Sequence, residues 1–551
     1  MSEPIWQASY RKNISWDMPL ECERYIDDVF DTACSTFPEQ CAFEFYSRRL
    51  TFRELRGLAA RIAKGLQSLD LAPRANIGLH LGNTPHYPAL FFGAIYAGVR
   101  IVNCSNNLGM RELQHQISDA QISVLITLAS PSVAAGIEGL LEAGTIETLI
   151  VCELGDFIDS ERFRTPANDS TRPDSAKGRI IPFRALIDND GLFRRFARAP
   201  VADEIAVIQY TGGTTGEPKG ALLTHRNIVS AVSMATLFMA YCDDSSYNKG
   251  LIVLPMPHIF ALCYMLATMS IGQEVVLHLR FDALNLLQDI ERQRIVSFSV
   301  VPTMLAAIAG HPRAREFDLS SLRRVYVGGA PAPEHVVREF EKLTKVRPMI
   351  GYGLSETSSI ATTNALAADP TLDSVGVPYP HTTVDIVDID TGLQPVAPGQ
   401  VGEICISGPQ IMKGYLNNEV ATAVAFRGGR FHTGDLGFID ARGLLTISDR
   451  KKDMIICGGF KVFPRNVEEV IREHPAIADV AVIGISDSMR GQCPKAFIVP
   501  RPGQRACSLS ELRSFLSDRL AAYELPVALE MLEKLPTTAV GKVAKNELVQ
   551  R

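Results

Sequence analysis

The chain has 551 residues, of which 46% are apolar and 21% are charged, and its net charge is −6. A single hydrophobic core rarely grows beyond about 250–300 residues, so we expect a globular protein of more than one domain. The acidic balance, with no long block of one sign, argues against a nucleic-acid-binding protein.

The N-terminal segment lacks the apolar core of a signal peptide. The longest apolar runs, Pro88–Val99 and Ile259–Ile271, are shorter than the roughly 20 residues that span a bilayer. Eleven cysteines are scattered without a Cys-x-x-Cys pair, which favours reduced thiols over a disulfide framework or a zinc site. We therefore expect a cytoplasmic protein, monomeric or homodimeric, and the sequence leaves a peripheral membrane contact open.

Short β-branched runs alternate with longer amphipathic stretches up to about residue 345, which predicts an α/β fold with largely parallel sheets. The predicted strands are Asn76–Leu81, Val124–Thr127, Thr148–Val151, Ala206–Gln209, Leu251–Leu254, Glu274–Leu277, Val296–Val300 and Val325–Val327. The predicted helices are Phe52–Leu69, Pro88–Ala97, Met110–Ser118, Arg226–Met239 and Pro333–Leu343.

The sequence changes character after about residue 375, where turn signals such as "FRGGRFHTGD" become dense and predict a small β-rich subdomain. A compact α+β module is expected from Arg450 onward. Its predicted elements are helices at Asn466–His474 and Leu509–Leu520 and strands at Val480–Ile485 and Lys495–Val499. We predict one domain over residues 1–449 and a second over residues 450–551.

The stretch "YTGGTTGEPKG" follows the predicted strand that ends near Gln209. Glycines allow close backbone approach, and successive N–H groups in a tight loop form a concavity for anions. Threonine hydroxyls and Lys219 would add donors and charge, so the loop suits a polyphosphate. It is neither a Walker A loop nor a dinucleotide fingerprint. A flexible surface loop of the same composition is the alternative that these residues alone leave open.

Seven further motifs follow in order. They are "LPMPHIFAL" (Leu254–Leu262), "VYVGGAPAP" (Val325–Pro333), "GYGLSET" (Gly351–Thr357), "GEICISGPQIMKGYLN" (Gly402–Asn417), "FHTGD" (Phe431–Asp435), "SDRKKDMIICGGFKVFP" (Ser448–Pro464) and "LPTTAVGKVAKNEL" (Leu535–Leu548). Together with the glycine-rich loop they resemble the adenylate-forming superfamily, and the N-terminal part looks most like bacterial fatty acyl-CoA synthetases. The resemblance implies a large N-terminal domain of stacked mixed and parallel sheets, and a small mobile C-terminal lid domain.

The resemblance also implies ATP, Mg²⁺ and CoA as partners of a carboxylic acid substrate. The implied phosphate loop comprises Thr211, Gly212, Gly213, Thr214, Thr215, Gly216 and Lys219. The implied nucleotide pocket comprises Gly329, Ala330, Pro331, Gly351, Tyr352, Gly353 and Ser355, with Asp435 and Arg450 at the ribose. Glu356 would bind Mg²⁺, for which oxygen ligands are suited.

Three residues form the implied catalytic set: Lys542, His258 and Thr215. Lys542 would bridge the acid carboxylate and the α-phosphate, where charge peaks in the transition state. Lys452 would be the hinge about which the lid rotates for thioester formation. In that second pose Gly458 and Gly459 would leave room for the pantetheine arm of CoA.

The sequence says less about the acid. By resemblance, the acyl pocket takes in Ile259–Leu262, Met304, Val327–Gly329, Gly351 and Ser358–Ile360, which contain no lysine or arginine. A fatty or other apolar acid fits best. Related ligases commonly have a proline near position 359, so "TSSI" suggests an altered pocket floor. An acyl-AMP ligase and an aryl-CoA ligase remain alternatives, and a serine esterase with Ser355 as nucleophile is a remote one.

Overall fold

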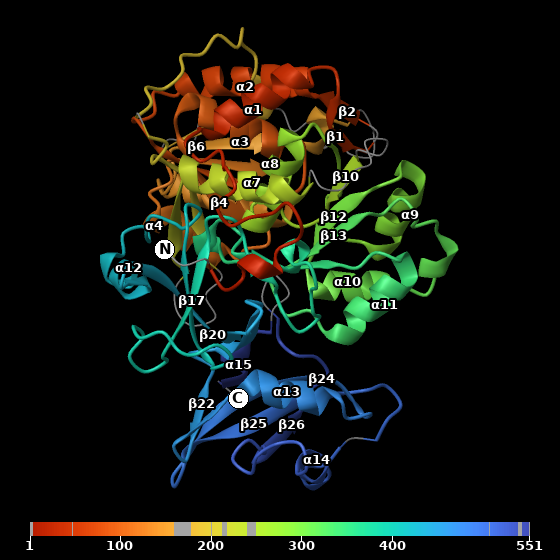
Figure 1. Cartoon of the computed structure of the whole chain (residues 1–551). Coiled ribbons are helices and arrows are strands. Elements are labelled where there is room, and N and C mark those ends of the chain that lie inside the picture. Colours follow the sequence, from red (N-terminus) through yellow and green to blue (C-terminus); the bar gives the residue numbers. More distant parts are fainter. Residues whose placement is uncertain are drawn as a thin grey trace.

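The computed structural model describes residues 4–46, 48–129, 131–158, 178–199, 201–211, 218–239, 249–505, 507–537 and 543–549. Two large sheets with their helices form one end of the molecule, and a small α+β module forms the other (Figure 1). A β-rich sheet lies between them.

The first large sheet has seven strands and is parallel except at one edge. Its strands, in spatial order, are β7 (Arg179–Pro182), β6 (Thr148–Cys152), β5 (Val124–Leu128), β3 (Asn76–Leu81), β4 (Arg100–Ser105), β8 (Ile205–Tyr210) and β9 (Gly220–Thr224). The exception is the hairpin of β8 and β9, which are antiparallel and connected by the glycine-rich loop.

The second large sheet has nine strands. In spatial order they are β16 (Val377–Pro378), β15 (Thr362–Thr363), β14 (Met349–Tyr352), β13 (Arg324–Val327), β12 (Ser297–Val300), β10 (Lys249–Ile252), β11 (Glu274–Leu277), β1 (Cys41–Phe45) and β2 (Arg48–Thr51). The strands from β14 to β1 are parallel, so their carboxyl ends share one edge, where ligands bind in open α/β sheets.

Helices cover the two large sheets. They are α1 (Ile26–Thr36), α2 (Phe52–Gln67), α3 (His86–Ala97), α4 (Met110–Asp119), α5 (Pro131–Glu142), α6 (Phe183–Leu186), α7 (His225–Met239), α8 (Ile259–Ser270), α9 (Ala283–Gln293), α10 (Pro302–Ala309) and α11 (Glu334–Thr344). Both α3 and α8 are apolar on all sides and buried along nearly their whole length, which accounts for the two longest apolar runs. No helix in the described ranges is long and apolar enough to cross a membrane.

The β-rich sheet and the C-terminal module complete the chain. The sheet contains β17 (Thr383–Val387), β18 (Gly402–Ser407), β19 (Phe426–Arg427), β20 (Arg430–Ile439) and β21 (Leu445–Arg450), with α12 (Glu419–Ala425) at its side. The module contains β22 (Ile455–Cys457), β23 (Phe460–Val462), α13 (Pro464–Arg472), β24 (Ile477–Asp487), β25 (Gly491–Pro500), α14 (Leu509–Leu516), β26 (Ala528–Met531) and α15 (Lys545–Val549).

The predicted fold class is confirmed, and each predicted helix and strand overlaps an observed one. The predicted strand Leu251–Leu254 runs two residues too far, since β10 ends at Ile252. Leu254 already lies in the loop after the strand, where its carbonyl accepts a hydrogen bond from Asn83 Nδ2 at 3.0 Å. The predicted helix Leu509–Leu520 ends early, at Leu516.

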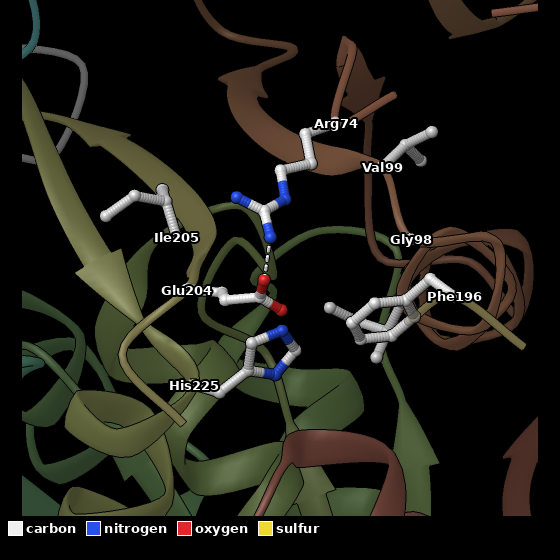
Figure 2. A pocket seen from close by; sticks show the side chains of 8 residues that line it. Arg74, Gly98, Val99, Phe196, Glu204, Ile205 and His225 are labelled. Atoms are coloured by element: carbon white, nitrogen blue, oxygen red, sulfur yellow. Dashed lines mark hydrogen bonds and ion pairs between the residues drawn. The ribbon is translucent and has the colours of Figure 1, made fainter. Parts of the chain in front are cut away.

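A cavity of about 20 Å³ lies at the start of β8, beside Ile205. Figure 2 shows the side chains of Arg74 and Glu204 pointing toward each other as an ion pair, with His225 next to them. Burial lowers the pKa of His225 to about 3. The glycine-rich loop follows the opposite end of β8, so this cavity, which has room for about one water molecule, lies away from the predicted site.

Candidate active site

The described ends of the glycine-rich loop are Thr211 and Lys219. The Thr211 amide donates to the Lys219 carbonyl at 2.9 Å, which extends the β8–β9 ladder by one bond to the base of the loop. The predicted phosphate-binding residues Gly212, Gly213, Thr214, Thr215 and Gly216 lie outside the described residues.

Glu356 lies in the 3-10 turn η5 (Ser355–Thr357), which follows β14. Its side chain accepts a hydrogen bond from Tyr415 Oη at 2.8 Å, and burial raises the pKa of its carboxyl. No group of three or more His, Cys, Asp or Glu side chains suited to a metal occurs in the described part of the chain. A single buried carboxylate suits Mg²⁺, which keeps several water or phosphate ligands.

Tyr352, Asp435 and Arg450 form a connected polar group. Tyr352 Oη donates to Asp435 Oδ2 at 2.7 Å, and Arg450 Nε lies 2.9 Å from Asp435 Oδ1. The Asp435 carboxylate raises the pKa of Arg450, and burial raises the pKa of Tyr352 well above its usual value. Three elements, β14, β20 and β21, therefore bring together residues that the sequence assigned to base and ribose.

Hydrogen bonds of the Thr433 hydroxyl hold the backbone of Asp435 in place. Its amide donates to Thr433 Oγ1 at 3.0 Å, and that hydroxyl donates to the carbonyl of Ile404 on the neighbouring strand β18. The Thr433 side chain thus fixes the turn at Gly434, where φ is +70°.

The predicted adenine segment Gly329, Ala330 and Pro331 begins two residues after β13 ends, at the shared carboxyl edge of the sheet. Gly329 has φ of +81°, which favours glycine. Gly351 lies in β14, and its carbonyl oxygen would be 3.5 Å from a Cβ added at Gly328.

Phe260 is also close to these glycines. A Cβ at Gly328 would lie 3.4 Å from Phe260 Cε1, so the N-terminal turn of α8 approaches the ends of β13 and β14. His258 is the N-cap of α8, and its Nδ1 accepts from the Phe260 amide at 3.2 Å. The Nδ1 atom of His258 therefore caps the N-terminus of α8. The sequence left open whether this histidine has such a structural role.

The turn after Glu356 has an unusual backbone. Ser358 and Ser359 have φ of +49° and +84°, and proline cannot adopt such values. A Cβ at Gly353 would lie only 1.9 Å from the Ser359 carbonyl oxygen, so this turn requires a glycine there. The backbone conformation therefore excludes proline at position 359.

The predicted hinge and thioester residues lie beyond β21. Burial lowers the pKa of Lys452. Gly458 and Gly459 connect β22 to β23, and φ values of +59° and +86° at these residues match a two-residue hairpin turn. Lys542 lies outside the described residues, but Thr537 and Val543 on either side of its segment pair as an antiparallel bridge.

Two kinds of contact were missed by sequence reasoning. One is Tyr415, which the quoted motif "MKGYLN" contained but which local pattern could not connect to Glu356, 59 residues away. The other is a buried amide network beneath the loop of His258, in which Gln209 Nε2 donates to the Pro257 carbonyl at 3.2 Å.

The esterase alternative does not fit this geometry. A nucleophile elbow places its serine in a turn between a strand and a helix. Ser355 instead starts the three-residue turn η5, after which the chain enters strand β15.

Comparisons with known proteins identify the family of the chain. The family described as "AMP-binding enzyme" matches residues 30–416, and the "AMP-binding enzyme C-terminal domain" matches residues 466–542. A long-chain-fatty-acid–CoA ligase of Bacillus subtilis (strain 168) is 34% identical over 559 residues, covering 100% of this chain and 98% of the relative. A feruloyl-CoA synthase of Amycolatopsis sp is 34% identical, covering 93% of this chain and 96% of the relative.

Solved structures give the same result. The o-succinylbenzoate CoA synthetase of Bacillus subtilis, in complex with its acyl-adenylate intermediate, has a TM-score of 0.78 and 27% identity, covering 94% of this chain and 97% of that one. An amide bond synthetase of Marinactinospora thermotolerans has a TM-score of 0.79 and 26% identity, covering 95% and 99%. The chain belongs to the AMP-binding enzyme family, as an acyl-CoA synthetase of the adenylate-forming superfamily.

Proposed function

We propose that this acyl-CoA synthetase uses a long-chain fatty acid. The observation that carries the proposal is the apolar character of α8, whose first turn brings Phe260 against the carboxyl ends of β13 and β14. The helix contains no charged residue, so a second charge on the acid would have no partner there. Relatives 34% and 30% identical over nearly the full chain are named long-chain-fatty-acid–CoA ligases, which supports the same acid class.

The reaction has two steps. A carboxylate oxygen of the acid attacks the α-phosphorus of ATP, and the bond to pyrophosphate breaks, giving acyl-AMP. The CoA sulfur then attacks the acyl carbon, AMP leaves with the electrons of the C–O bond, and the thiol proton passes to solvent. Bound Mg²⁺ supplies neutralising charge to the phosphates.

Adenylation depends on positioning and charge. In our proposal, Thr211 and Lys219, with the loop between them, hold the phosphates, and Glu356 holds Mg²⁺. Asp435 accepts hydrogen bonds from the ribose hydroxyls, for which Arg450 keeps it oriented at 2.9 Å. Lys542 cancels charge between the carboxylate and the α-phosphate.

The base and the acid occupy neighbouring positions in this proposal. Tyr352 offers a face to adenine while its hydroxyl stays bonded to Asp435, and the segment 329–331 covers the other side. His258 borders the acid carboxylate, where its position at the N-cap of α8 also places the positive end of the helix dipole.

Thioester formation requires a second arrangement of the C-terminal module. We propose a domain boundary between residues 449 and 450, with Lys452 as the hinge. The last strand of the β-rich sheet, β21, ends at Arg450, and the next strand, β22, belongs to a different sheet, which supports that boundary. Gly458 and Gly459 would then face the pantetheine arm of CoA, since their turn lacks side chains.

The acid class is tested by incubating the protein with ATP, Mg²⁺ and CoA and a panel of acids, followed by mass spectrometry. The panel contains C4–C18 fatty acids, benzoate, cinnamate, coumarate and dicarboxylates, and a parallel series omits CoA. We expect acyl-CoA and AMP, with the highest yield from the long-chain acids. A preference for the aryl acids or dicarboxylates would contradict the fatty acid assignment.

An aryl-CoA ligase is the second candidate, because a feruloyl-CoA synthase is also 34% identical. Hydroxycinnamate ligases often have a tyrosine where this chain has Phe260, and the missing hydroxyl disfavours a phenolic acid. The positive φ of Ser359 supports an altered pocket floor.

An acyl-AMP ligase is a third alternative. It would be identified by acyl-AMP that forms but is never transferred to CoA.

We also propose a cytoplasmic location. All ten described cysteines are free, and Cys457 Sγ and Cys493 Sγ lie 3.8 Å apart without a bond, which is compatible with a reducing compartment. Fractionation of the source cells tests this, and recovery in an extracytoplasmic fraction would contradict it.

A further inference from the structure

Tyr415 lies where three segments of the chain meet. The backbone around it runs alongside β9, since the Leu416 amide donates to the Gly220 carbonyl at 2.7 Å and the Leu222 amide donates to the Gly414 carbonyl at 2.9 Å. This pairing fixes Tyr415 opposite Ala221, directly after the glycine-rich loop.

The hydroxyl of Tyr415 reaches the carboxylate of Glu356. Tyr415 Oη donates to Glu356 Oε1 at 2.8 Å. On the backbone side, the Met412 amide donates to the Glu356 carbonyl at 2.7 Å. The segment that carries Tyr415 therefore holds Glu356 through both its main chain and its side chain.

The ring of Tyr415 faces the last residue of the loop. Lys219 Nζ lies 5.2 Å from the ring centroid, within the range of a cation–π contact. Tyr415 packs against the edge of the main hydrophobic core, is only half-buried and borders a recess of about 510 Å³. One side chain thus contacts both the loop lysine and the buried carboxylate.

We propose that Tyr415 is a positioning residue that couples the metal-binding carboxylate to the phosphate loop. The inference rests on the proposed roles of Glu356 and Lys219. The hydroxyl fixes the orientation of the carboxylate, and the ring restricts the lysine that reaches the phosphates. Both restraints limit the conformational freedom of the two side chains before MgATP binds. Less conformational entropy is then lost on binding, which favours a lower Kd.

The hydroxyl and the ring have separate targets, so two substitutions separate their effects. Tyr415→Phe removes only the bond to Glu356, whereas Tyr415→Leu also removes the aromatic face below Lys219. A matched control is Tyr96→Phe, which removes a comparable hydrogen bond from a buried tyrosine to Asp31 Oδ1, 2.5 Å long and in another part of the fold.

Isothermal titration calorimetry with ATP, with Mg²⁺ and with EDTA, tests the coupling without turnover. For Tyr415→Phe we expect the Kd of MgATP to rise roughly tenfold, as for a lost hydrogen bond to a charged group. The Kd of metal-free ATP should stay within about twofold of the wild-type value. Tyr415→Leu should weaken both, and Tyr96→Phe should change neither.

Equal weakening with and without Mg²⁺ in Tyr415→Phe, or no weakening at all, would overturn the inference. A second measurement uses Glu356→Gln as background. If the hydroxyl acts through the carboxylate, adding Tyr415→Phe to Glu356→Gln should change MgATP binding no further. An additive loss would show that Tyr415 acts through another route.

Binding and turnover fail separately in this design. If the wild-type protein binds MgATP but forms no acyl-AMP from any acid in the panel, the proposed acid activation is wrong. The calorimetric comparison of Tyr415→Phe and Tyr96→Phe still decides the role of Tyr415 in that case.

Discussion

Arg450 and Asp435 are register partners on the adjacent antiparallel strands β21 and β20, and their side chains form an ion pair 2.9 Å long. The same carboxylate accepts a hydrogen bond from the hydroxyl of Tyr352. The pairing of two strands in the β-rich sheet therefore sets the orientation of the proposed ribose-binding carboxylate.

Asp435→Asn should raise the KM for ATP roughly tenfold or more. The substitution removes the carboxylate that pairs with Arg450 and that accepts hydrogen bonds from the ribose hydroxyls in our proposal. Steady-state kinetics with varied ATP measure it. Asp385→Asn is the matched control, since Asp385 pairs with Arg430 at 2.8 Å in the same sheet. Equal KM values for the two variants would argue against a ribose contact.

Lys542→Ala should reduce acyl-AMP formation by roughly a hundredfold or more, as expected when charge stabilisation in the transition state is lost. Pyrophosphate exchange measures the first step alone, and thermal unfolding checks that the fold is unchanged. Lys534→Ala, an exposed lysine of the same C-terminal segment, should exchange at the wild-type rate. Near-normal exchange in Lys542→Ala would remove this lysine from the mechanism.

Gly459→Leu should spare acyl-AMP formation and block transfer to CoA, because a side chain would occupy the proposed pantetheine path. Gly503→Leu controls for backbone strain, since both glycines have positive φ, +86° and +79°, and open space where a Cβ would lie. Single-turnover assays of each half-reaction distinguish the steps. Loss of both half-reactions in Gly459→Leu alone would contradict the two-pose proposal.

Lys545→Met should destabilise the C-terminal module by about 2 kcal/mol, since it removes the nearer of two charged partners of the buried Glu468 carboxylate and leaves only Arg472, at 3.9 Å. Lys545 Nζ lies 2.7 Å from Glu468 Oε1, and this oxygen also accepts from the Val482 amide at 2.8 Å. Denaturant unfolding measures the loss, and Lys545→Arg should recover most of it. Identical midpoints for Met and Lys at this position would show that the pair contributes nothing.

Acid should destabilise the fold partly through His225. Its pKa is lowered by burial to about 3, so the unfolded chain, with a pKa near 6.5, binds the proton more tightly. The contribution is complete above pH 6.5 and decreases as the pH falls toward 3, by about 2 kcal/mol at pH 5. His225→Gln should flatten the fall in unfolding temperature between pH 7.5 and 5, whereas exposed His335→Gln should not.

Local sequence pattern predicted half of the strands in the two large sheets and missed the others, among them β1, β2, β4 and β14. The strands β3 and β11 have the predicted bounds, because β-branched runs there are bounded by turns and polar residues. The helix α9 was missed, although its N-cap Asp282, which accepts from the Asn285 amide at 2.8 Å, is a recognisable start signal. Periodicity fixes which face of an element is buried, but not which element it packs against.

The candidate site was predicted from motifs rather than from periodicity. Motif order brought Glu356, Asp435 and Arg450 into one hypothesis, and the structure places Asp435 and Arg450 in direct contact. The contact of Tyr415 with Glu356 could not be predicted, because it depends on how the segment 413–416 pairs with β9. Such pairing is set by tertiary packing across the two sheets.

The hydrogen bond from the Thr211 amide to the Lys219 carbonyl involves main-chain atoms alone. Every residue except proline has the amide that position 211 needs, and every residue has the carbonyl that position 219 needs. This hydrogen bond therefore does not depend on which side chains occupy the two positions. A library randomised at positions 211 and 219 should therefore yield mostly folded members. The few that retain activity would report the side-chain chemistry that ATP itself selects.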